Sequence, residues 1–205
     1  MIILFIGAQA SGKGTQAKII AQKKGFAHIS TGDLLRASEG KLKELADSYM
    51  AEGKLVPSEI IINMLKKRIK QPDCKKGVIL DGFPRNLEQA EELEKIIKID
   101  KIFEITISDE TAKKRLMGRW NCKKCGIAYN VVTEPNPKKQ GLCDNCQVPL
   151  YQRDDDKDEK AIEKRLAIYH EETEPILKKF KERVIKINGE QAIEKITEDI
   201  LKKLD

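Results

Sequence analysis

A glycine-rich segment near the N-terminus has residue types and a spacing that suit phosphate binding. Residues 7 to 15 read Gly-Ala-Gln-Ala-Ser-Gly-Lys-Gly-Thr, which contains the pattern G-x-x-x-x-G-K of a phosphate-binding loop, or P-loop. Glycines let backbone N–H groups turn toward phosphate oxygens, and Lys13 adds a mobile positive charge for the outer phosphates. The alternative is a glycine turn with an incidental lysine, and the strand and helix expected on either side count against it.

Four of the five cysteines form two close pairs whose spacing is typical of a metal site. Cys122 and Cys125 are followed, after seventeen intervening residues, by Cys143 and Cys146. Two such pairs of thiolates can close around one tetrahedral zinc ion and leave no position for water, which indicates a structural rather than a catalytic site. Iron is the alternative metal for four sulfurs. Cys74 stands outside this pattern and is expected to be a free thiol.

The elements that must position these residues alternate between strands and helices. Apolar runs predict strands at Ile2–Ile6, Ala27–Ile29, Val78–Leu80, Ile102–Ile107 and Val184–Ile187. Helical periodicity predicts helices at about Lys13–Lys23, Glu88–Lys98, Glu110–Gly118, Asp158–Lys181 and from Ala192 to the end, with helical pieces over Asp33–Lys70 that break around Gly53 and Pro57. Repeated βα units indicate an α/β fold with a parallel sheet between two helical layers, and ligands of such folds bind at the carboxyl ends of the strands.

Composition narrows the class of protein without deciding its function. The chain has 205 residues, of which 40% are hydrophobic and 35% charged, so it can bury an ordinary core without disulfides. No apolar run approaches the roughly 20 residues that span a bilayer, and the apolar N-terminus is interpreted as a buried strand rather than a signal peptide. The net charge of +6 fits an enzyme that handles polyphosphates and equally fits a nucleic-acid-binding protein. Paired cysteines without a secretory signal favour metal binding in a reducing cytosol.

Four segments, taken in order, resemble the adenylate kinase family of nucleoside monophosphate kinases. The run Gly12-Lys13-Gly14-Thr15-Gln16 looks like the family's loop, in which the hydroxyl residue stands one place late; most members have Pro-Gly where this chain has Gln9-Ala10. Residues 28–36, 53–57 and 81–89 resemble the motifs HISTGDxLR, GxLVP and DGFPRxxxQ. The resemblance covers nearly the whole chain. It implies a P-loop nucleoside triphosphate hydrolase-like three-layer αβα fold with an inserted zinc-binding lid and a helical AMP-binding segment.

The same resemblance implies the residues that contact each substrate. Those expected at ATP are Ala10, Ser11, Gly12, Lys13, Gly14, Thr15, Arg115, Arg119, Ala128, Tyr129 and Gln191, with Arg115 stacked on the adenine ring. Those expected at AMP are Thr31, Arg36, Lys54, Leu55, Val56, Gly82, Phe83, Pro84, Arg85, Gln89, Arg153 and Arg165. The expected catalytic group consists of Lys13, Arg85, Arg119, Arg153 and Arg165.

The chemistry of several of these residues agrees with the resemblance. Arg36 and Arg85 carry planar guanidinium groups that can grip a phosphate through two hydrogen bonds each. Asp81 ends an apolar strand, where a carboxylate can anchor Mg²⁺ through the water shell of the ion. Gln89 can both donate to and accept from the edge of an adenine. The resemblance further implies AMP over CMP or UMP, because pyrimidine-specific relatives usually have Asn in place of Gln89 and Ala in place of Thr31. The acidic run Asp154–Asp156 has two open interpretations, a lock for the arginines or a solvated surface.

The expected reaction is direct in-line transfer, MgATP + AMP ⇌ MgADP + ADP, with a role in purine nucleotide homeostasis. Its transition state spreads charge over the phosphoryl oxygens, so positive groups with Mg²⁺ would stabilise it, and closure of the lid would exclude water. The expected division is a core of residues 1–29, 59–118 and 155–205, an AMP-binding segment of residues 30–58 and a zinc-binding lid of residues 119–154. The expected protein is a cytoplasmic monomer that binds ATP, AMP and ADP, with Zn²⁺ and Mg²⁺ as cofactors and no nucleic-acid or membrane partner.

Two alternative functions remain open from the sequence. One is a kinase for another nucleoside monophosphate, which assays with AMP, GMP, CMP and UMP would separate. The other is a zinc-ribbon protein that binds nucleic acid and hydrolyses ATP. Against the second, Tyr129 is the one aromatic residue between the cysteine pairs, which makes a poor stacking platform for bases.

Overall fold

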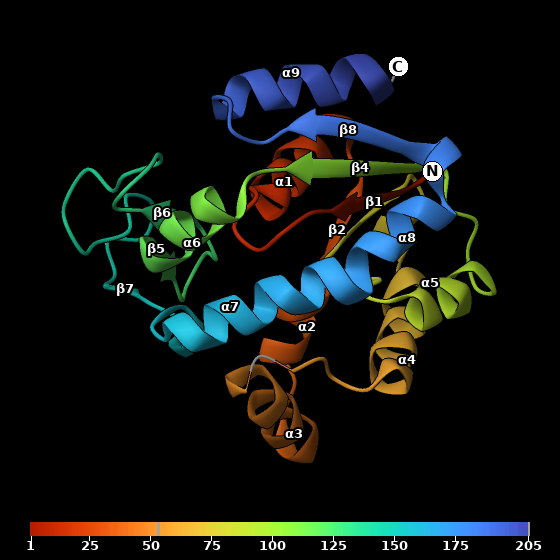
Figure 1. Cartoon of the computed structure of the whole chain (residues 1–205), viewed down its shortest axis with the longest axis horizontal. Coiled ribbons are helices and arrows are strands. Elements are labelled where there is room, and N and C mark those ends of the chain that lie inside the picture. The colour runs from red at the N-terminus through yellow and green to blue at the C-terminus, as the bar shows by residue number, and fades with distance from the viewer. Residues whose placement is uncertain (53, 205) are drawn as a thin grey trace.

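A five-stranded parallel sheet forms the centre of the computed structural model, which describes residues 1–52 and 54–204 (Figure 1). Its strands are β1 (Ile2–Ile6), β2 (Ala27–Ser30), β3 (Val78–Asp81), β4 (Lys101–Thr106) and β8 (Val184–Asn188), in the order β2-β3-β1-β4-β8. Parallel neighbours require crossover connections, which the helices between them supply. The α/β class and the parallel sheet predicted from the sequence are therefore confirmed.

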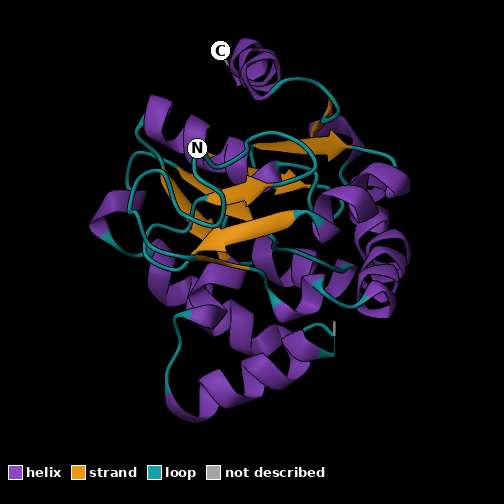
Figure 2. Ribbon diagram, turned by 90° about the vertical axis from the view of Figure 1, so that its left-hand side faces the viewer, coloured by secondary structure: helices purple, strands orange, loops and turns teal. Residues whose placement is uncertain are grey.

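The central position of β1 in the sheet explains why apolar and polar residues do not alternate along this strand. Ile3 and Phe5 pack on one face of the sheet, beneath α1 (Lys13–Lys24) and α9 (Ile193–Leu204). Leu4 and Ile6 pack on the other face. Because successive side chains of a strand point to opposite faces, a strand covered on both sides must be apolar throughout. Figure 2 shows the resulting layers, with the sheet between two sets of helices.

The second helical layer consists of α4 (Ser58–Ile69), α5 (Leu87–Glu94), α6 (Asp109–Met117), α7 (Glu159–Ile168) and α8 (Glu174–Lys179). The helix predicted over Asp158–Lys181 is interrupted there by a π-helical turn, Tyr169–Thr173. Pro175 accounts for the interruption, because it lacks a backbone N–H and its ring clashes with the carbonyl of residue 171 in an ordinary helix. The wider turn that precedes Pro175 carries the bond from Glu174 N to Tyr169 O.

A second helix also differs from its prediction. The range Glu88–Lys98 was expected to be helical, whereas α5 ends at Glu94. The chain turns earlier because Ile99 is buried in the core and Asp100 pairs with Ile2, through both its backbone N–H and its carboxylate. These contacts align β4 beside β1, and tertiary packing therefore overrides the local helical preference.

Between β2 and α4 lie α2 (Thr31–Arg36) and α3 (Gly40–Ala51), which the sequence analysis predicted as helical pieces. Ser30 begins α2 by accepting a hydrogen bond from Asp33 N on its side-chain oxygen, at 3.2 Å. Pro57 immediately precedes α4, as its fixed φ favours. The predicted break at Gly53 lies outside the described residues.

The cysteine-rich insertion forms a small sheet of its own at the left of Figure 1. Its strands β5 (Arg119–Cys122), β6 (Ala128–Asn130) and β7 (Leu150–Tyr151) are antiparallel, in the order β6-β5-β7. Among the described residues, the buried hydrophobic side chains of this module are those of Cys122, Tyr129, Cys143 and Leu150. So few apolar side chains cannot stabilise about thirty residues by burial alone, so the module needs a further source of stability. Among the residues described, no helix has the length and apolarity that crossing a membrane requires.

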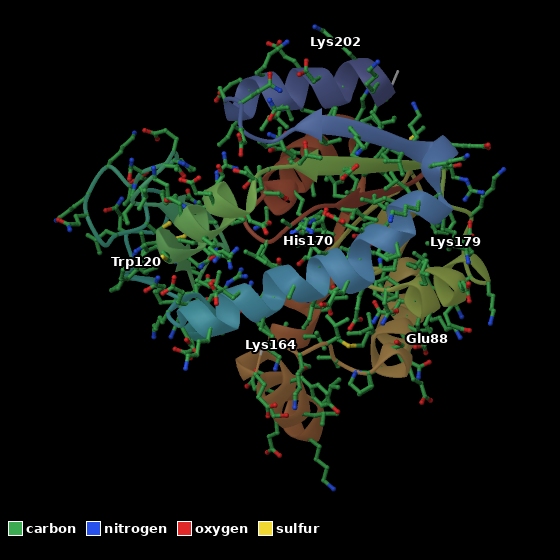
Figure 3. The ribbon with its side chains drawn as sticks, viewed as in Figure 1. Glu88, Trp120, Lys164, His170, Lys179 and Lys202 are labelled. Atoms are coloured by element: carbon green, nitrogen blue, oxygen red, sulfur yellow. The ribbon has the colours of Figure 1, made fainter. Side chains whose placement is uncertain are left out.

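The side chain of His170 links α6, which precedes the cysteine-rich module, to the helical segment that follows the module. In Figure 3 it lies on the long helical segment formed by α7, the π-helical turn and α8. Its Nε2 atom lies 2.9 Å from Asp109 Oδ1 of α6, and its Nδ1 atom lies 2.8 Å from Glu174 Oε1. The hydrogen bond to Asp109, followed by that to Glu174, raises the pKa of His170 above its ordinary value. The Tyr169 ring is its other close neighbour.

We expect this arrangement to make stability depend on pH. Because the folded-state pKa of His170 is raised, its contribution is fully present below the unfolded pKa of about 6.5 and is lost as the pH rises through the folded pKa. The His170→Gln variant should melt about 1 to 3 °C below the parent protein at pH 6 and nearer to it at pH 9, since half-exposed pairs contribute little. Lys195→Gln, which removes an exposed ion pair with Asp199, is the control. Its difference from the parent should stay constant over this range, and a constant difference for His170→Gln would contradict the prediction.

Candidate active site and metal centre

The predicted P-loop connects β1 to α1 and leaves the first turn of that helix free to bind an anion. Gly12 occupies the N-cap position with a φ of 93°, and no side chain caps the helix. Its first backbone N–H groups are therefore available for phosphate oxygens. Lys13 Nζ donates to Ala8 O at 3.0 Å, which folds this side chain back over the loop.

Ala10 stands where loops of this type more often have glycine, and it adopts the backbone conformation that glycine favours. Its φ is 59°, in the left-handed region that costs a non-glycine residue roughly 1–2 kcal/mol. The carbonyl oxygen of Ala10 faces Arg115 Nη1 at 3.5 Å. The loop thus keeps its turn at this position despite the methyl group.

Asp81 lies directly against the start of α1. A Cβ atom placed on Gly14 would lie 3.0 Å from Asp81 Oδ2, so the glycine permits this close approach. The same oxygen lies 3.5 Å from His28 Nε2. The end of β3 therefore presents a carboxylate beside the phosphate-binding loop, where the sequence analysis expected a water-mediated contact with Mg²⁺.

The residues predicted at the acceptor nucleotide form a compact set around Gly82. Thr31 Oγ1 and Arg85 Nε both donate to Gly82 O, at 2.9 and 2.8 Å. Gln89 Oε1 accepts from Arg85 N at 2.8 Å, which orients the Gln89 amide with its N–H groups available to a ligand. Arg36 Nη2 pairs with Asp33 Oδ1 at 2.6 Å. One turn after β3 thus positions both a guanidinium group and an amide.

The acidic run divides into a buried part and an exposed part. Asp156, with an exposed fraction of 1%, accepts two hydrogen bonds from Arg119, Nε to Oδ2 at 2.8 Å and Nη2 to Oδ1 at 2.7 Å. Its Oδ1 also accepts from Arg165 Nη1 at 3.0 Å. Asp155 pairs with Arg165 at 3.0 Å, whereas Asp154 is exposed and pairs with Lys157. Asp155 and Asp156 therefore hold the arginines, and Asp154 belongs to the surface.

Positive charge is concentrated in the cleft beyond what these carboxylates offset. Burial, opposed by Asp81 and reinforced by Arg85, Arg119 and Arg165, lowers the pKa of Lys13 to about 8. Burial and the positive charges of Arg119 and Arg36 lower the pKa of Arg153 to about 10. The Nε atom of Arg153 is buried and has no hydrogen-bond partner in the part of the chain that is described. Such a cluster favours binding of an anion. The negative charge of the anion would raise the lowered pKa values of Lys13 and Arg153 toward their ordinary range.

The predicted residues converge on one cleft of about 870 Å³, near the upper end of the range for ligand sites. The residues of the two nucleotide sets that line it are Ala10, Ser11, Gly12, Lys13, Gly14, Thr15, Thr31, Arg36, Lys54, Leu55, Val56, Gly82, Phe83, Arg85, Gln89, Arg115, Arg119, Ala128, Tyr129, Arg153, Arg165 and Gln191, together with Asp81. Pro84 is the exception and does not line the cleft in residues 1–52 and 54–204.

Arg115 and Gln191, two residues expected to contact ATP, come from distant segments of the chain. Arg115 Nη2 donates to Gly189 O at 3.0 Å, and burial lowers its pKa. Glu190 accepts from both the backbone and the hydroxyl of Ser108, which fixes the loop that carries Gln191 against the start of α6. Gln191 Nε2 donates to Asn188 O at 3.0 Å, which shapes the turn.

Three further residues carry no characteristic signal in the sequence: Lys18 and Asn121, which line the cleft, and Lys164, which is not among its lining residues in the part of the chain that is described. Lys18 of α1 donates to Gly126 O of the cysteine-rich module at 2.9 Å, and Lys164 of α7 donates to Glu52 O at 2.9 Å. Figure 3 shows Lys164 on the side of α7 that lies toward α3. Asn121 of β5 is buried in the cleft wall, and its side-chain N–H group has no partner among the described residues. Isolated lysines and an asparagine have no characteristic spacing, so only the fold reveals them.

The four cysteines predicted to bind a metal come together. The Sγ atoms of Cys122, Cys125, Cys143 and Cys146 all lie within 4.8 Å of one another. Cys125 Sγ and Cys143 Sγ are 3.6 Å apart, close to the roughly 3.8 Å that separates two sulfurs on one tetrahedral zinc with Zn–S bonds of about 2.3 Å. The residues therefore fit a closed zinc site. Cys74 lies elsewhere, buried beside Arg68, as a free thiol.

Comparison with known proteins finds relatives that match this chain over nearly its whole length. A family model described as adenylate kinase matches residues 5–185. A protein named adenylate kinase from Caldicellulosiruptor saccharolyticus is 44% identical, and the match covers 100% of this chain and 99% of that protein. A protein of the same name from Acetivibrio thermocellus is 42% identical, and the match covers 100% of this chain and 98% of that protein. Another, from Methanocella arvoryzae, is 43% identical, and the match covers 98% of this chain and 96% of that protein.

Proposed function

The chain belongs to the adenylate kinase family, and from that premise we propose how its residues divide the work of the reaction. The protein is an ATP:AMP phosphotransferase, an enzyme that moves a phosphoryl group reversibly from ATP to AMP and forms two ADP. One observation carries the residue assignments. Lys13, Arg36, Arg85, Arg119, Arg153 and Arg165 line a single cleft together with a phosphate-binding loop.

The donor nucleotide binds with its phosphates in the loop of residues 10–15, where free N–H groups of α1 and Lys13 meet the β- and γ-phosphates. Ala128, Tyr129, Arg115 and Gln191 surround its base and ribose. The acceptor nucleotide binds beside α2 and Gly82, with Gln89 at the adenine edge and Arg36 and Arg85 on its phosphate. This assignment puts the two phosphate chains end to end between Lys13 and Arg153.

The mechanism is direct in-line transfer, in which an oxygen of the AMP phosphate attacks the γ-phosphorus of ATP. The attacking oxygen is already anionic, so no general base is required. Arg85, Arg119, Arg153 and Arg165 stabilise the charge that spreads over the transferring oxygens, and Asp156 fixes two of them in place. Asp81 would hold Mg²⁺ through the water shell of the ion, which would supply further positive charge at the phosphates.

The division of the chain follows from these roles. We assign residues 1–29, 59–118 and 155–205 to a core, residues 30–58 to the AMP-binding segment and residues 119–154 to a lid that carries a structural zinc. The bonds Lys18–Gly126 and Lys164–Glu52 would be two of the contacts between the core and these two segments. We further propose that the protein acts as a monomer in purine nucleotide homeostasis and that it lies in the cytoplasm. The paired cysteines, which suit a reducing compartment, support the cytoplasmic location.

The test is production of ADP from ATP and each of AMP, GMP, CMP and UMP. We expect AMP to be the preferred acceptor, and Lys13→Ala to lower the rate by about a hundredfold or more, because it removes the charge nearest the transferred group. Lys95→Ala is the control, since Lys95 is exposed and pairs with Glu92 away from the cleft. A preference for another acceptor would overturn the role of Gln89, and full activity of Lys13→Ala would overturn that of the loop.

A further inference from the structure

The hydroxyl group of Tyr129 lies between the nucleotide cleft and the cysteine cluster. Tyr129 belongs to β6 and has an exposed fraction of 5%. Its Oη atom accepts a hydrogen bond from Asp144 N at 2.9 Å and lies 3.6 Å from Cys143 Sγ. Because an amide already donates to this oxygen, the hydroxyl proton is free to be donated to the sulfur. The result is a short chain of hydrogen bonds that ends on a metal-ligand atom.

Cys143 is the cysteine that most needs such a donor. Its exposed fraction is 0%, and a buried thiolate is costly unless its charge is shared with hydrogen-bond donors or a metal. Its sulfur also accepts from Cys146 N at 3.4 Å. Tyr129 supplies the one side-chain hydroxyl that reaches a cysteine sulfur of this cluster within the described residues.

The strand that carries Tyr129 is itself firmly placed. The side chain of the next residue, Asn130, donates to Arg115 O at 2.8 Å and accepts from Val132 N and Thr133 N. Tyr129 pairs in register with Trp120 of β5, and Cys122 lies two residues further along the same strand. These contacts fix the tyrosine relative to both the cleft, which it lines, and the cluster.

We propose that Tyr129 is a positioning residue for the zinc ion. Its hydroxyl orients the Cys143 thiolate and stabilises its negative charge, and so slows the release of the metal. Removing a partner of this kind typically costs 10- to 100-fold in metal affinity. The proposal rests on the proposed zinc site and adds a role for Tyr129 that is separate from its contact with ATP.

The experiment compares zinc release from the full-length parent protein and from Tyr129→Phe, which removes only the hydroxyl. Both are loaded with one zinc per chain, and release to a chromogenic chelator is followed after stopped-flow mixing, without nucleotide. We expect release from Tyr129→Phe to be about tenfold faster or more. Tyr151→Phe is the matched control from β7 of the same sheet. Its ring lies against Lys123, and its zinc release should match that of the parent.

A second readout separates the hydrogen bond from simple packing. In cobalt-substituted protein, loss of a donor to the thiolate should move the sulfur-to-cobalt charge-transfer band to lower energy in Tyr129→Phe. Unchanged zinc release, or faster release without a band shift, would overturn the proposal. If the parent itself bound no metal after loading, the zinc site would be wrong, and that outcome is measured before the variants are compared.

Discussion

Replacement of Arg85 by alanine is expected to lower the rate of ADP formation by at least about a hundredfold while the fold remains intact. The structure gives the reason. The Arg85 guanidinium is fixed by a bond from Nε to Gly82 O at 2.8 Å, which leaves its terminal nitrogens for phosphate oxygens. Burial, followed by the positive charge of Arg165, lowers its pKa, so the free enzyme holds this charge at a cost that a bound phosphate would offset.

The melting temperature of Arg85→Ala should not fall along with its activity. Removing Arg85 relieves repulsion with Arg165 and Arg36, so the melting temperature should stay within about 2 °C of the parent or rise. The backbone N–H of Arg85 still bonds Gln89 in the variant, which keeps the acceptor pocket formed. Steady-state kinetics with AMP and ATP, together with thermal melts by circular dichroism, measure both effects.

Two further variants make this test specific. Arg85→Lys keeps the charge but loses the planar pair of donors, so its rate should fall between those of the parent and the alanine variant. Arg183→Ala removes a half-exposed arginine that does not line the cleft formed by the described residues and that pairs with Glu94, the last residue of α5, at 2.7 Å. It should be nearly as active as the parent. Near-normal activity of Arg85→Ala would remove Arg85 from the catalytic group.

Removal of the zinc ion is the second change with a large expected effect, and the effect is on stability. The module of residues 119–154 has a core of only a few buried side chains, and metal binding by its four cysteines would supply free energy that this burial cannot. We expect the melting temperature to fall by at least about 10 °C after the metal is stripped. The measurement is differential scanning calorimetry on loaded and stripped protein whose metal content has been determined.

Chemistry should change far less than stability. The four cysteines do not line the cleft within residues 1–52 and 54–204, so an ion held by their sulfurs would lie outside it. The turnover number, measured well below the lower melting temperature, should therefore remain close to that of the loaded enzyme. Cys74→Ser is the matched control, because Cys74 is a buried thiol outside the cluster, and this variant should keep both the metal and the response to its removal. Unchanged melting after verified metal removal would contradict a structural site.

The agreement between sequence and structure is closest where function depends on local spacing. The P-loop pattern places Gly12 and Lys13 at the start of α1, because a strand, a glycine turn and a helix are all encoded by neighbouring residues. The apolar run Ile2–Ile6 became the central strand β1, since a strand covered on both faces has no polar positions. The cysteine spacing likewise predicted a cluster that the structure forms.

The departures occur where packing between distant segments overrides local preference. The helix that begins at Leu87 ends at Glu94 because Asp100 must pair with Ile2, nearly a hundred residues away. The helix predicted over Asp158–Lys181 is interrupted because Pro175 widens the turn that precedes it. Helical periodicity measures only neighbours along the chain, so it overestimates helices whose ends are set by the sheet.

By itself, the sequence determined the order along the chain of the five strands of the central sheet, the phosphate-binding loop and the identity of the four cysteines that cluster. The tertiary structure alone decided which carboxylates hold the arginines. Asp156 reaches Arg119, thirty-seven residues earlier, and Asp155 and Asp156 both pair with Arg165, whereas the chemically identical Asp154 pairs with Lys157 at the surface. The tertiary structure also decided that the Tyr129 hydroxyl faces Cys143 as its side chain lines the cleft. The physical reason is that spacing along the chain determines which groups are near in a loop or helix, whereas hydrogen bonds across the cleft depend on how whole elements pack.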